Sequence, residues 1–390
     1  MSSPDSTPTP VVVTECADYG PNTVDAAVRR AVDLLGGIAR FVHPGQTVLL
    51  KPNLLSARPP EQAVTTHPEL VRALAVLCRE AGAARVWIGD SPAGMHSEAI
   101  LWEKTGMAVA AELAGAELKS FEDAVTPMPV GEDALPVPSW FSEVDVLISL
   151  PKLKTHGLTT MTCAMKNLFG LACGEAKAMC HARHPSPAAM SRFLADWYVQ
   201  VKPALTVVDA VVAMEGEGPA NGTPRPVGVL LAAADAVAVD AVCVRTLGLN
   251  PESVPMLKRA RETGAGETRL AHIELLGDGL ARLAAVRLKQ PDTRLLRYIP
   301  ESLFQLVSRL LRFRPAIDQK LCVACGICIG ICPRRAIRAR ADHSQRPNTV
   351  NERACILCLC CVEACPRHAI RIRSPLDLWN RIAGRARGRM

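Results

Sequence analysis

A sixteen-residue segment near the C-terminus occurs twice, thirty-three positions apart, and each copy reads C-x2-C-x2-C-x3-C-P. The copies span residues 322–337 and 355–370 and are identical at eight of their sixteen positions. This spacing is typical of bacterial ferredoxins with two 4Fe-4S clusters, in which the fourth cysteine of each run binds the cluster of the other run. We therefore predict two clusters with these ligands: Cys322, Cys325, Cys328 and Cys365 for the first, and Cys355, Cys358, Cys361 and Cys332 for the second.

Zinc ribbons and disulfide frameworks are the alternatives for closely spaced cysteines. Zinc sites usually use two separated C-x2-C pairs, and disulfides require an oxidising compartment, so both fit this pattern less well than iron-sulfur clusters do. The second copy departs from the first in having Leu359 where the first has Gly326, and in having an additional Cys360 beside Cys361. The register of the repeat favours Cys361 as the ligand, which leaves Cys360 as a packed thiol or an alternative ligand.

The composition is that of a globular chain. The 390 residues are enough for two domains, and 49% of them are hydrophobic but only 4% aromatic. Residues 1–10 are rich in Ser, Pro and Thr, so we expect them to be disordered and not to form a secretory or transit signal. No uncharged apolar run reaches the roughly 18 residues of a membrane-spanning helix. Because most of the fifteen cysteines fit metal ligation, we expect a reducing, cytoplasmic location.

The net charge of +7 is divided unevenly along the chain. Residues 1–280 carry 23 Lys and Arg against 31 Asp and Glu (−8), whereas residues 281–390 carry 22 against 7 (+15). The arginines of the second part offset the charge of the clusters and form a solvated face, or they dock an acidic redox partner. Apolar side chains between Leu295 and Leu311 also fit an amphipathic helix on anionic lipid, so peripheral membrane contact is an alternative. Nucleic acid is disfavoured, because no binding module is recognisable and aromatic residues are few.

Short β-branched runs alternate with helical stretches over residues 11–280. Strands are expected at 11–15, 47–50, 85–88, 144–150, 205–208 and 227–231, and helices at 23–35, 68–81, 97–114, 186–199 and 235–247. This alternation predicts an α/β fold, with a mainly parallel sheet and helices on both faces. The cysteine repeat adds a small C-terminal α+β ferredoxin-like domain with two clusters. We therefore divide the chain into a disordered N-terminus (1–10), an α/β domain (11–280), a basic helical linker (281–315), a ferredoxin domain (316–373) and a basic tail (374–390).

Polar residues follow four of the expected strands. Ligands bind at the carboxyl ends of strands in such sheets, so we expect these residues to converge on a binding site. They comprise Lys51 and Asn53, Asp90, the segment 151–156 with Lys152, Lys154 and His156, and Asp209. With Lys166 and Asn167 they predict a cationic site for a phosphate or carboxylate. The hydroxyls and free N-H groups of residues 65–68, which open a helix, add an anion contact. Neither GxGxxG nor GxxxxGK[ST] occurs, so a standard dinucleotide fold or P-loop is not indicated.

The segment 155–185 is dense in reactive side chains but matches no metal motif. Burial as small hydrophobes is the commoner fate of free cysteines and is expected for Cys163 and Cys173. Cys180, His181 and His184 leave a third metal site as an alternative. His156 can act as a general acid or base, since the unperturbed pKa of histidine is near 6.5. It can equally bind the same anion as the lysines.

The stretch of about 48–249 resembles the domain of unknown function 362 family, which is often joined to a ferredoxin module. The similar segments are KPN (51–53), TTHPEL (65–70), GDSP (89–92), PKLKTH (151–156), KNLFG (166–170), VVDAVVAMEGEGP (207–219) and AVAVDAV (236–242). The resemblance implies an iron-sulfur protein of this architecture. It does not imply a substrate.

Three functions are compatible with these features. The leading hypothesis is an oxidoreductase component in which two 4Fe-4S clusters pass electrons to an anionic substrate or cofactor in the α/β domain. In this hypothesis Lys51, Lys152, Lys154 and Lys166 position the anion, Asn53, Asp90 and Asn167 orient it, and His156 transfers a proton. The alternatives are a cluster carrier or maturation protein, suggested by the additional thiols, and an electron-transfer adaptor that docks an acidic partner through residues 282–314.

Overall fold

The computed structural model describes residues 8–92, 97–304, 306–307, 314–339 and 347–373. Within these residues the largest element is a ten-stranded sheet with the order β12-β1-β11-β10-β7-β2-β3-β4, and β8 and β9 extend it beside β10. Neighbouring strands are parallel except at β11, which is antiparallel to β1 and β10, and at β9, which is antiparallel to β8. The strands are β1 (Thr9–Glu15), β2 (Thr47–Pro52), β3 (Arg85–Ile88), β4 (Glu117–Leu118), β7 (Val146–Leu150), β8 (Lys152–His156), β9 (Thr160–Thr162), β10 (Leu205–Glu215), β11 (Thr223–Ala233) and β12 (Ile273–Leu276). A separate hairpin consists of β5 (Val125–Val130) and β6 (Asp133–Pro138).

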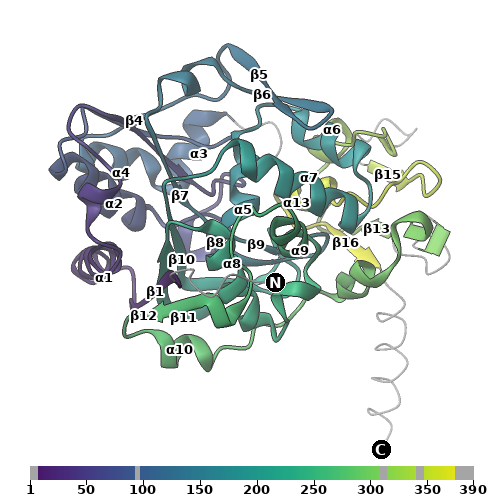
Figure 1. Cartoon of the computed structure of the whole chain (residues 1–390). Helices are drawn as coiled ribbons and strands as arrows, with labels where there is room; N and C mark the ends of the chain where they lie inside the picture. Colours follow the sequence, from purple (N-terminus) through teal and green to yellow (C-terminus); the bar gives the residue numbers. More distant parts are fainter. Residues whose placement is uncertain (1–7, 93–96, 305, 308–313, 340–346, 374–390) are drawn as a thin grey trace, which may run out of the picture.

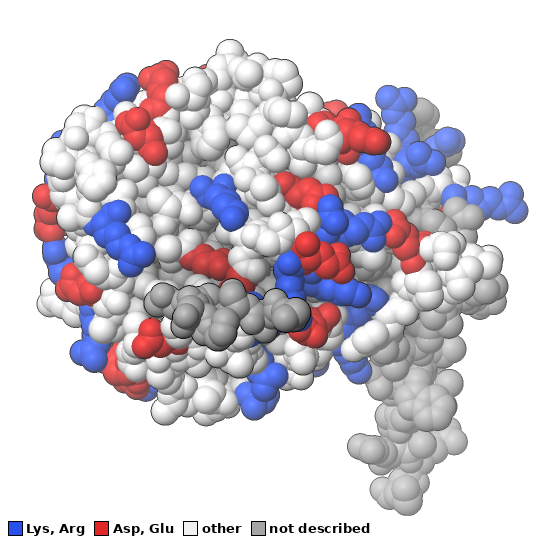
Figure 2. All heavy atoms as spheres, viewed as in Figure 1, with Lys and Arg blue, Asp and Glu red and all other residues white. Residues whose placement is uncertain are grey.

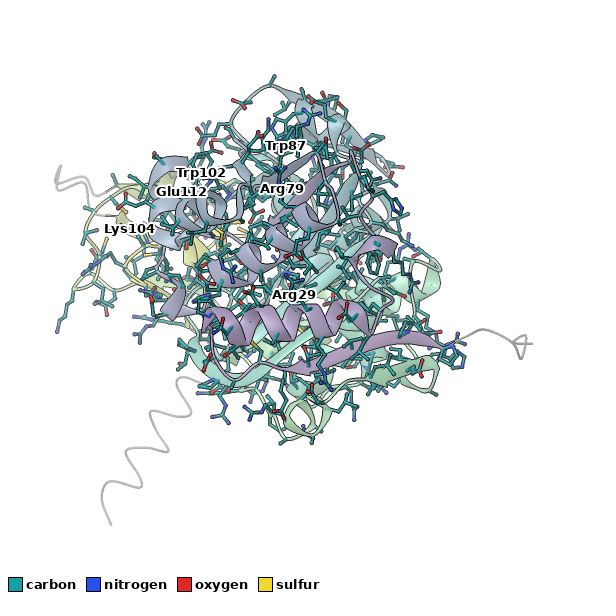
Figure 3. The ribbon with its side chains drawn as sticks, turned by 90° about the vertical axis from the view of Figure 1, so that its left-hand side faces the viewer. Arg29, Arg79, Trp87, Trp102, Lys104 and Glu112 are labelled. Carbon is teal, nitrogen blue, oxygen red and sulfur yellow. The ribbon has the colours of Figure 1, made fainter. Side chains whose placement is uncertain are left out.

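Helices cover both faces of this sheet (Figure 1). One face carries α1 (Pro21–Asp33), α2 (Pro68–Glu80), α3 (Glu98–Thr105) and α4 (Met107–Ala114). Figure 3 views the molecule from this side, with Arg29 on α1, Arg79 on α2 and Glu112 on α4. The other face carries α5 (Ala164–Asn167), α7 (Pro187–Gln200), α8 (Ala236–Cys243) and α9 (Pro255–Glu262). Two further helices are α6 (Ala176–Arg183) and α10 (Leu280–Ala284).

Helix α2 illustrates how the sequence specifies these elements. Pro68 occupies its first position, where a missing N-H costs nothing, and His67 Nδ1 accepts a hydrogen bond from the backbone N of Glu69. Leu70, Leu74 and Leu77 recur at helical spacing and are buried against the sheet. Capping and periodicity agree, so the expected helix at 68–81 forms nearly unchanged.

The predicted α/β fold with helices on both faces is confirmed. Several short elements were not expected, among them the β5–β6 hairpin and α9, and two of the expected segments differ. The helix expected at 97–114 is interrupted at Gly106, whose φ of +74° is in the left-handed region. Residues 152–156, expected as a loop after a strand, form strand β8 instead. All five are buried, because β8 pairs with both β10 and β9. Such pairing depends on tertiary contacts, which the polar composition of this segment does not show.

The expected small α+β domain is also confirmed. It contains two antiparallel pairs, β13 (Arg314–Ile317) with β16 (Ile370–Arg373) and β14 (Ile337–Ala339) with β15 (Pro347–Val350). Two short helices, α12 (Ile327–Gly330) and α13 (Cys360–Glu363), lie between these strands in the sequence.

The charged side chains are distributed unevenly over the surface. On the face that Figure 2 shows, basic and acidic side chains are interspersed over the α/β domain, whereas basic side chains dominate at the right-hand edge, near the C-terminal domain.

The linker expected to be helical is described only in part. After α10 it forms two 3-10 turns, Asp292–Tyr298 and Glu301–Leu303. Phe304, expected on a lipid-facing helix, is buried against Leu357 of the C-terminal domain. The predictions for residues 1–7, 305, 308–313 and 374–390 concern parts outside the described residues. Among the helices that the structure describes, none combines the length and the apolar character that crossing a bilayer requires.

Candidate functional site

Two cavities in the C-terminal domain each collect four cysteines. One is lined by Cys322, Cys325, Cys328 and Cys365, and the other by Cys332, Cys355, Cys358 and Cys361. These are the two crossed ligand sets that the spacing predicts, with three cysteines from one copy and the fourth from the other. Four thiols around one cavity are the donor set of a 4Fe-4S cluster, so the residues fit this group. Cys360 lines neither cavity.

The two halves of this domain repeat the same backbone conformation. Three positions in each copy have a left-handed φ, at equivalent places in the repeat: Ala324, Gly326 and Arg335 in the first, and Leu357, Leu359 and His368 in the second. The fourth cysteine of each copy also accepts an equivalent hydrogen bond. The backbone N of Ala336 lies 3.2 Å from Cys332 Sγ, and that of Ala369 lies 3.3 Å from Cys365 Sγ. Such N-H donors stabilise the thiolate form that binds iron.

The substitution of Leu359 for the glycine of the first copy has a structural reason. A left-handed φ costs a non-glycine residue about 1–2 kcal/mol. The Leu359 side chain is buried against the α/β domain, where it packs beside Gly157 and Thr293. A Cβ on Gly157 would lie 2.9 Å from Leu359 Cδ1, so the absence of a side chain at Gly157 permits this close contact. Burial of a leucine contributes about 1.5–3 kcal/mol, which offsets the strain.

Arg58 forms a second contact between the domains. It is 5% exposed and lies in the loop after β2. Its guanidinium donates to the carbonyl oxygens of Ala220 and Cys365, both at 2.9 Å, and contacts the ring of His368. Through Arg58, the α/β domain therefore fixes the backbone at Cys365, which is one of the four cysteines of the first cavity.

The polar strand ends converge as expected, but two of the four lysines form ion pairs. Lys51 Nζ lies 2.6 Å from Asp90 Oδ1, and a Cβ on Gly170 would come within 2.0 Å of the same oxygen. Lys152 Nζ lies 2.9 Å from Asp209 Oδ2. Burial lowers the pKa of Lys51 and of Lys152, and the paired carboxylates oppose this shift. Neither lysine lines the cavity in which Lys154 and Lys166 lie.

The helix start at residues 65–68 is also internally satisfied. The backbone N of His67 donates to Asp209 Oδ2 at 2.9 Å, so this carboxylate occupies the place expected for an external anion. The Thr66 hydroxyl donates to the carbonyl of Leu150 at 2.6 Å and accepts from the backbone N of Asn53 at 2.9 Å. These bonds fix the strand ends around the site.

The remaining lysines lie in a cavity of about 80 Å³ between the two domains, which we call the lysine pocket. Its lining includes Lys154, Lys166 and Lys177 from the α/β domain, and Ile331, Cys360 and Glu363 from the C-terminal domain. Asn53, Asp90 and Asn167 also line it, and Asn53 Oδ1 accepts a 2.9 Å hydrogen bond from Lys154 Nζ. The predicted residues Asn53, Asp90, Lys154, Lys166 and Asn167 are therefore brought together.

Several polar groups in the lysine pocket lack partners. Within the described ranges, Thr162 Oγ1 and His181 Nδ1 are buried without a hydrogen bond, and Lys166 has no hydrogen bond or ion pair. Burial and the charge of Lys166 lower the pKa of Lys154 well below its usual value. Burial also lowers the pKa of Lys177 to about 8. The carboxylates of Asp90 and Glu363 also line the pocket, so three lysines face two carboxylates. An anion there would accept from the lysines and the Thr162 hydroxyl and would relieve the repulsion between the lysines.

His156 is held in one tautomer outside the lining of this pocket. Its Nδ1 accepts hydrogen bonds from the backbone N of Leu158 (3.0 Å) and of Thr159 (3.2 Å), so Nδ1 carries no proton. Nε2 of the neutral ring then carries the proton and lies 3.2 Å from Glu363 Oε1. Burial lowers the pKa of His156 to about 4. Burial alone would raise the pKa of Glu363, but His156 and the charge of Lys166 lower it to about 2.

The thiols and imidazoles of segment 155–185 lie apart. Cys163 is buried near Asp240, whose carboxylate accepts hydrogen bonds from the backbone N atoms at the start of α5. His181 reaches the lysine pocket, whereas His184 Nε2 lies 3.0 Å from Asp133 Oδ2. Apart from the two cysteine cavities, whose size suits a cluster and not a single ion, no group of three or more His, Cys, Asp or Glu among the described residues is placed to hold a metal ion.

Sequence reasoning missed three residues of the site. Arg58 is a single arginine in a proline-rich loop, and its contact depends on a domain arrangement that has no local signal. Lys177 lies on α6, outside the strand ends at which ligands are expected. Glu363 lies within the cysteine repeat, at the position where the first copy has Gly330. This difference between the copies at a non-cysteine position was the available signal for Glu363.

Two family models match the chain. A domain of unknown function (DUF362) matches residues 48–245, and a 4Fe-4S dicluster domain matches residues 314–366. A thylakoid-associated protein from Synechocystis sp. is 34% identical over 259 residues, which cover 64% of this chain and 78% of that protein.

Two solved structures are more distant. A protein from Thermotoga maritima is 15% identical with a TM-score of 0.34, over 64% of this chain and 60% of that one. The lactate racemase apoprotein from Thermoanaerobacterium thermosaccharolyticum is 12% identical with a TM-score of 0.39, over 60% of this chain and 57% of that one. At TM-scores this low, neither structure informs the function of this chain.

Proposed function

Because the chain belongs to the domain of unknown function 362 family and carries a 4Fe-4S dicluster domain, we propose that it is an iron-sulfur oxidoreductase component acting on an anionic molecule in the lysine pocket. The sequence predicts a domain of this family joined to a ferredoxin domain with two clusters, and the two family matches confirm this architecture. The observation that carries the proposal is the composition of the pocket wall. Lysines of the α/β domain face Cys360 and Glu363, which are neighbours of cluster ligands. The anion site therefore adjoins the cluster-binding segment, because Ile331 and Cys360 in its wall are the sequence neighbours of the ligands Cys332 and Cys361.

The lysines bind the anion in this proposal. Lys166 makes no hydrogen bond or close ion pair with the described residues, although the charge of Glu363 acts on it. Lys154 and Lys177 donate only to neutral oxygens, so all three lysines can donate to a phosphate or carboxylate. Asn53 fixes Lys154 through the 2.9 Å hydrogen bond and thereby orients the anion indirectly. Lys51 and Lys152 hold the strand ends in place through Asp90 and Asp209. The clusters supply single electrons when bound.

His156 has a positioning role rather than a proton-transfer role in this proposal. Its Nδ1 is occupied by two backbone donors, and its Nε2 faces a carboxylate instead of the pocket. Protonation of Nδ1 would direct its new N-H at the backbone N-H groups of Leu158 and Thr159, which is unfavourable. His156 therefore anchors Glu363, which lies in the wall contributed by the C-terminal domain.

The proposal includes a reducing compartment, a protein redox partner and an anionic small molecule. Basic side chains at the edge of the C-terminal domain suit an acidic partner (Figure 2). The relative from Synechocystis is described as thylakoid-associated, and peripheral membrane contact remains part of the proposal for this chain. The cluster-carrier alternative has less support, because Cys163, Cys173 and Cys180 are buried, and burial raises the pKa of each thiol.

Reoxidation of the reduced protein tests the proposal. Protein with both clusters is reduced anaerobically and mixed with a panel of carboxylate and phosphate compounds, and cluster reoxidation is followed by visible absorption. We expect one class of anion to reoxidise wild type at least tenfold faster than Lys166→Met. Lys104→Met is the matched control, because Lys104 is exposed on α3 (Figure 3) and is not among the residues that line the pocket. If the rates of wild type and Lys166→Met agree for every compound, the proposed anion site is wrong.

A further inference from the structure

A second and larger hollow adjoins the lysine pocket. This cleft has a volume of about 1030 Å³, compared with about 80 Å³ for the pocket. The two share Ser91, Gly174 and Ile331 in their walls, so they lie side by side. Like the pocket, the cleft lies between the domains: Phe121, Val125 and Cys173 line it on one side, and Cys325 and Ile327 on the other.

The sizes of the two compartments indicate a ligand in two parts. A space of roughly 10–15 Å³ accommodates one water by the same measure. The lysine pocket therefore holds a group of a few heavy atoms, such as a phosphate, and not a whole cofactor. The cleft is more than ten times larger and shares three wall residues with the pocket, so the rest of the molecule has room next to it.

The walls of the cleft indicate the chemistry of that second part. Phe121, Val125, Pro136, Ile327 and Ile331 give it apolar surfaces. The Phe121 ring is fixed, since it packs edge-on against Trp140 with ring centroids 5.3 Å apart. Four carboxylates line the cleft, from Glu98, Glu122, Asp123 and Glu175, and can accept hydrogen bonds from ring N-H groups. One oxygen of Glu98 already accepts from the backbone N of Phe121. An aromatic ring system with polar edges suits these walls better than a second anion, which the carboxylates would repel.

Cys325 places the ring part beside a cluster. It is exposed, and it lines both the cleft and the first cluster cavity. Clusters exchange one electron at a time, whereas many organic substrates gain electrons in pairs. A flavin accepts electrons singly and passes them on in pairs, so it matches both requirements.

We propose that the cleft and the lysine pocket together bind flavin mononucleotide, with the phosphate among Lys154, Lys166 and Lys177 and the ring in the cleft beside Cys325. In the reaction, one electron from each reduced cluster and two protons from solvent convert the oxidised ring to its dihydro form, and each cluster is oxidised by one electron. A protein redox partner then reduces the clusters again. This inference rests on the proposed function only in using the lysine pocket as an anion site.

Binding to the anaerobic cluster-loaded protein tests this inference with three probes: flavin mononucleotide, riboflavin and inorganic phosphate. Flavin binding is measured by fluorescence quenching and phosphate binding by equilibrium dialysis. We expect flavin mononucleotide to bind at least tenfold more tightly than riboflavin, and Lys166→Met to abolish that difference. Val125→Glu should weaken both flavins at least tenfold, because Val125 lines the cleft. Val109→Glu, at an exposed valine on α4, is the matched control.

The outcomes separate this inference from the proposed function. If phosphate binds in a Lys166-dependent manner but flavin mononucleotide binds no more tightly than phosphate, the flavin inference is wrong and the anion site stands. If neither phosphate nor either flavin binds, both are wrong. Iron content and the EPR spectrum of each reduced variant establish that loss of binding does not come from loss of the clusters.

Discussion

The guanidinium of Arg58 donates a 2.9 Å hydrogen bond to the carbonyl oxygen of Cys365, so a buried cation of one domain touches a cluster ligand of the other. The two residues are 307 positions apart in the chain. Their contact connects the electrostatics of the first cluster site to the α/β domain.

Replacing Arg58 by Met should lower the reduction potential of one cluster. A nearby positive charge stabilises the more negative, reduced form, and burial strengthens this effect. A tenfold change in the equilibrium constant corresponds to about 59 mV for one electron, and we expect at least this shift in an EPR-monitored redox titration. Arg58→Lys keeps the charge and should shift the potential less. Equal potentials in wild type and Arg58→Met would show that the contact is only mechanical.

Gly170→Ala should destabilise the α/β domain. A Cβ there would lie 2.0 Å from Asp90 Oδ1 and 2.7 Å from Lys51 Nζ, so the buried ion pair would have to separate. Overpacking costs about 1–3 kcal/mol, and breaking a buried pair costs about 3–5 kcal/mol. Gly330→Ala is the control, because a Cβ there meets nothing within 4 Å. The measurement is the midpoint of thermal unfolding by circular dichroism, and similar midpoints for the two variants would contradict the prediction.

Anion binding to the lysine pocket should weaken as the pH rises through about 8. Burial lowers the pKa of Lys177 to about 8, so the free pocket loses this proton at mildly alkaline pH. The bound anion favours the charged amine, which means that binding takes up a proton, and the affinity falls by up to about tenfold per pH unit above the pKa. Sulfate is a suitable probe in equilibrium dialysis, because its own charge is constant in this range. Lys177→Gln should bind sulfate more weakly at neutral pH and remove this pH dependence.

Cys360→Ala should retain both clusters, whereas Cys361→Ala should lose the second. Cys361 lines the second cluster cavity, but Cys360 lines the lysine pocket. Each cluster contributes four irons, so we expect about eight irons per chain in Cys360→Ala and about four in Cys361→Ala, measured on anaerobically purified protein. Loss of iron from Cys360→Ala would instead identify Cys360 as a ligand.

Local sequence signals were sufficient for most of the fold. Strands β2 and β3 begin where the β-branched runs begin, and α2 forms where capping and periodicity coincide. The crossed cysteine sets could be predicted from the spacing of the cysteines, because the geometry of a 4Fe-4S cluster restricts the spacing of its ligands. In contrast, β8 depends on pairing with β10, which is distant in the sequence, as well as with the adjacent β9, and its polar residues gave no indication of burial.

The site was predicted less completely than the fold. Convergence of the strand ends correctly grouped Lys154, Lys166, Asn53 and Asn167, but it could not distinguish them from Lys51 and Lys152. That distinction depends on which carboxylate lies opposite each lysine, and hence on side-chain packing. The contacts of Arg58 and Glu363 depend on how the two domains pack against each other. Composition and periodicity do not predict that packing.

The crossed ligand sets also restrict the order in which the protein can be made. Neither cavity has its four thiols until the ribosome has translated Cys365 and Cys361, whereas the strands around Lys154 and Lys166 are complete much earlier. The nascent α/β domain therefore exposes its lysines to solvent before any iron can be inserted. Closure of the lysine pocket, which requires Glu363 and Ile331, is among the last steps of maturation.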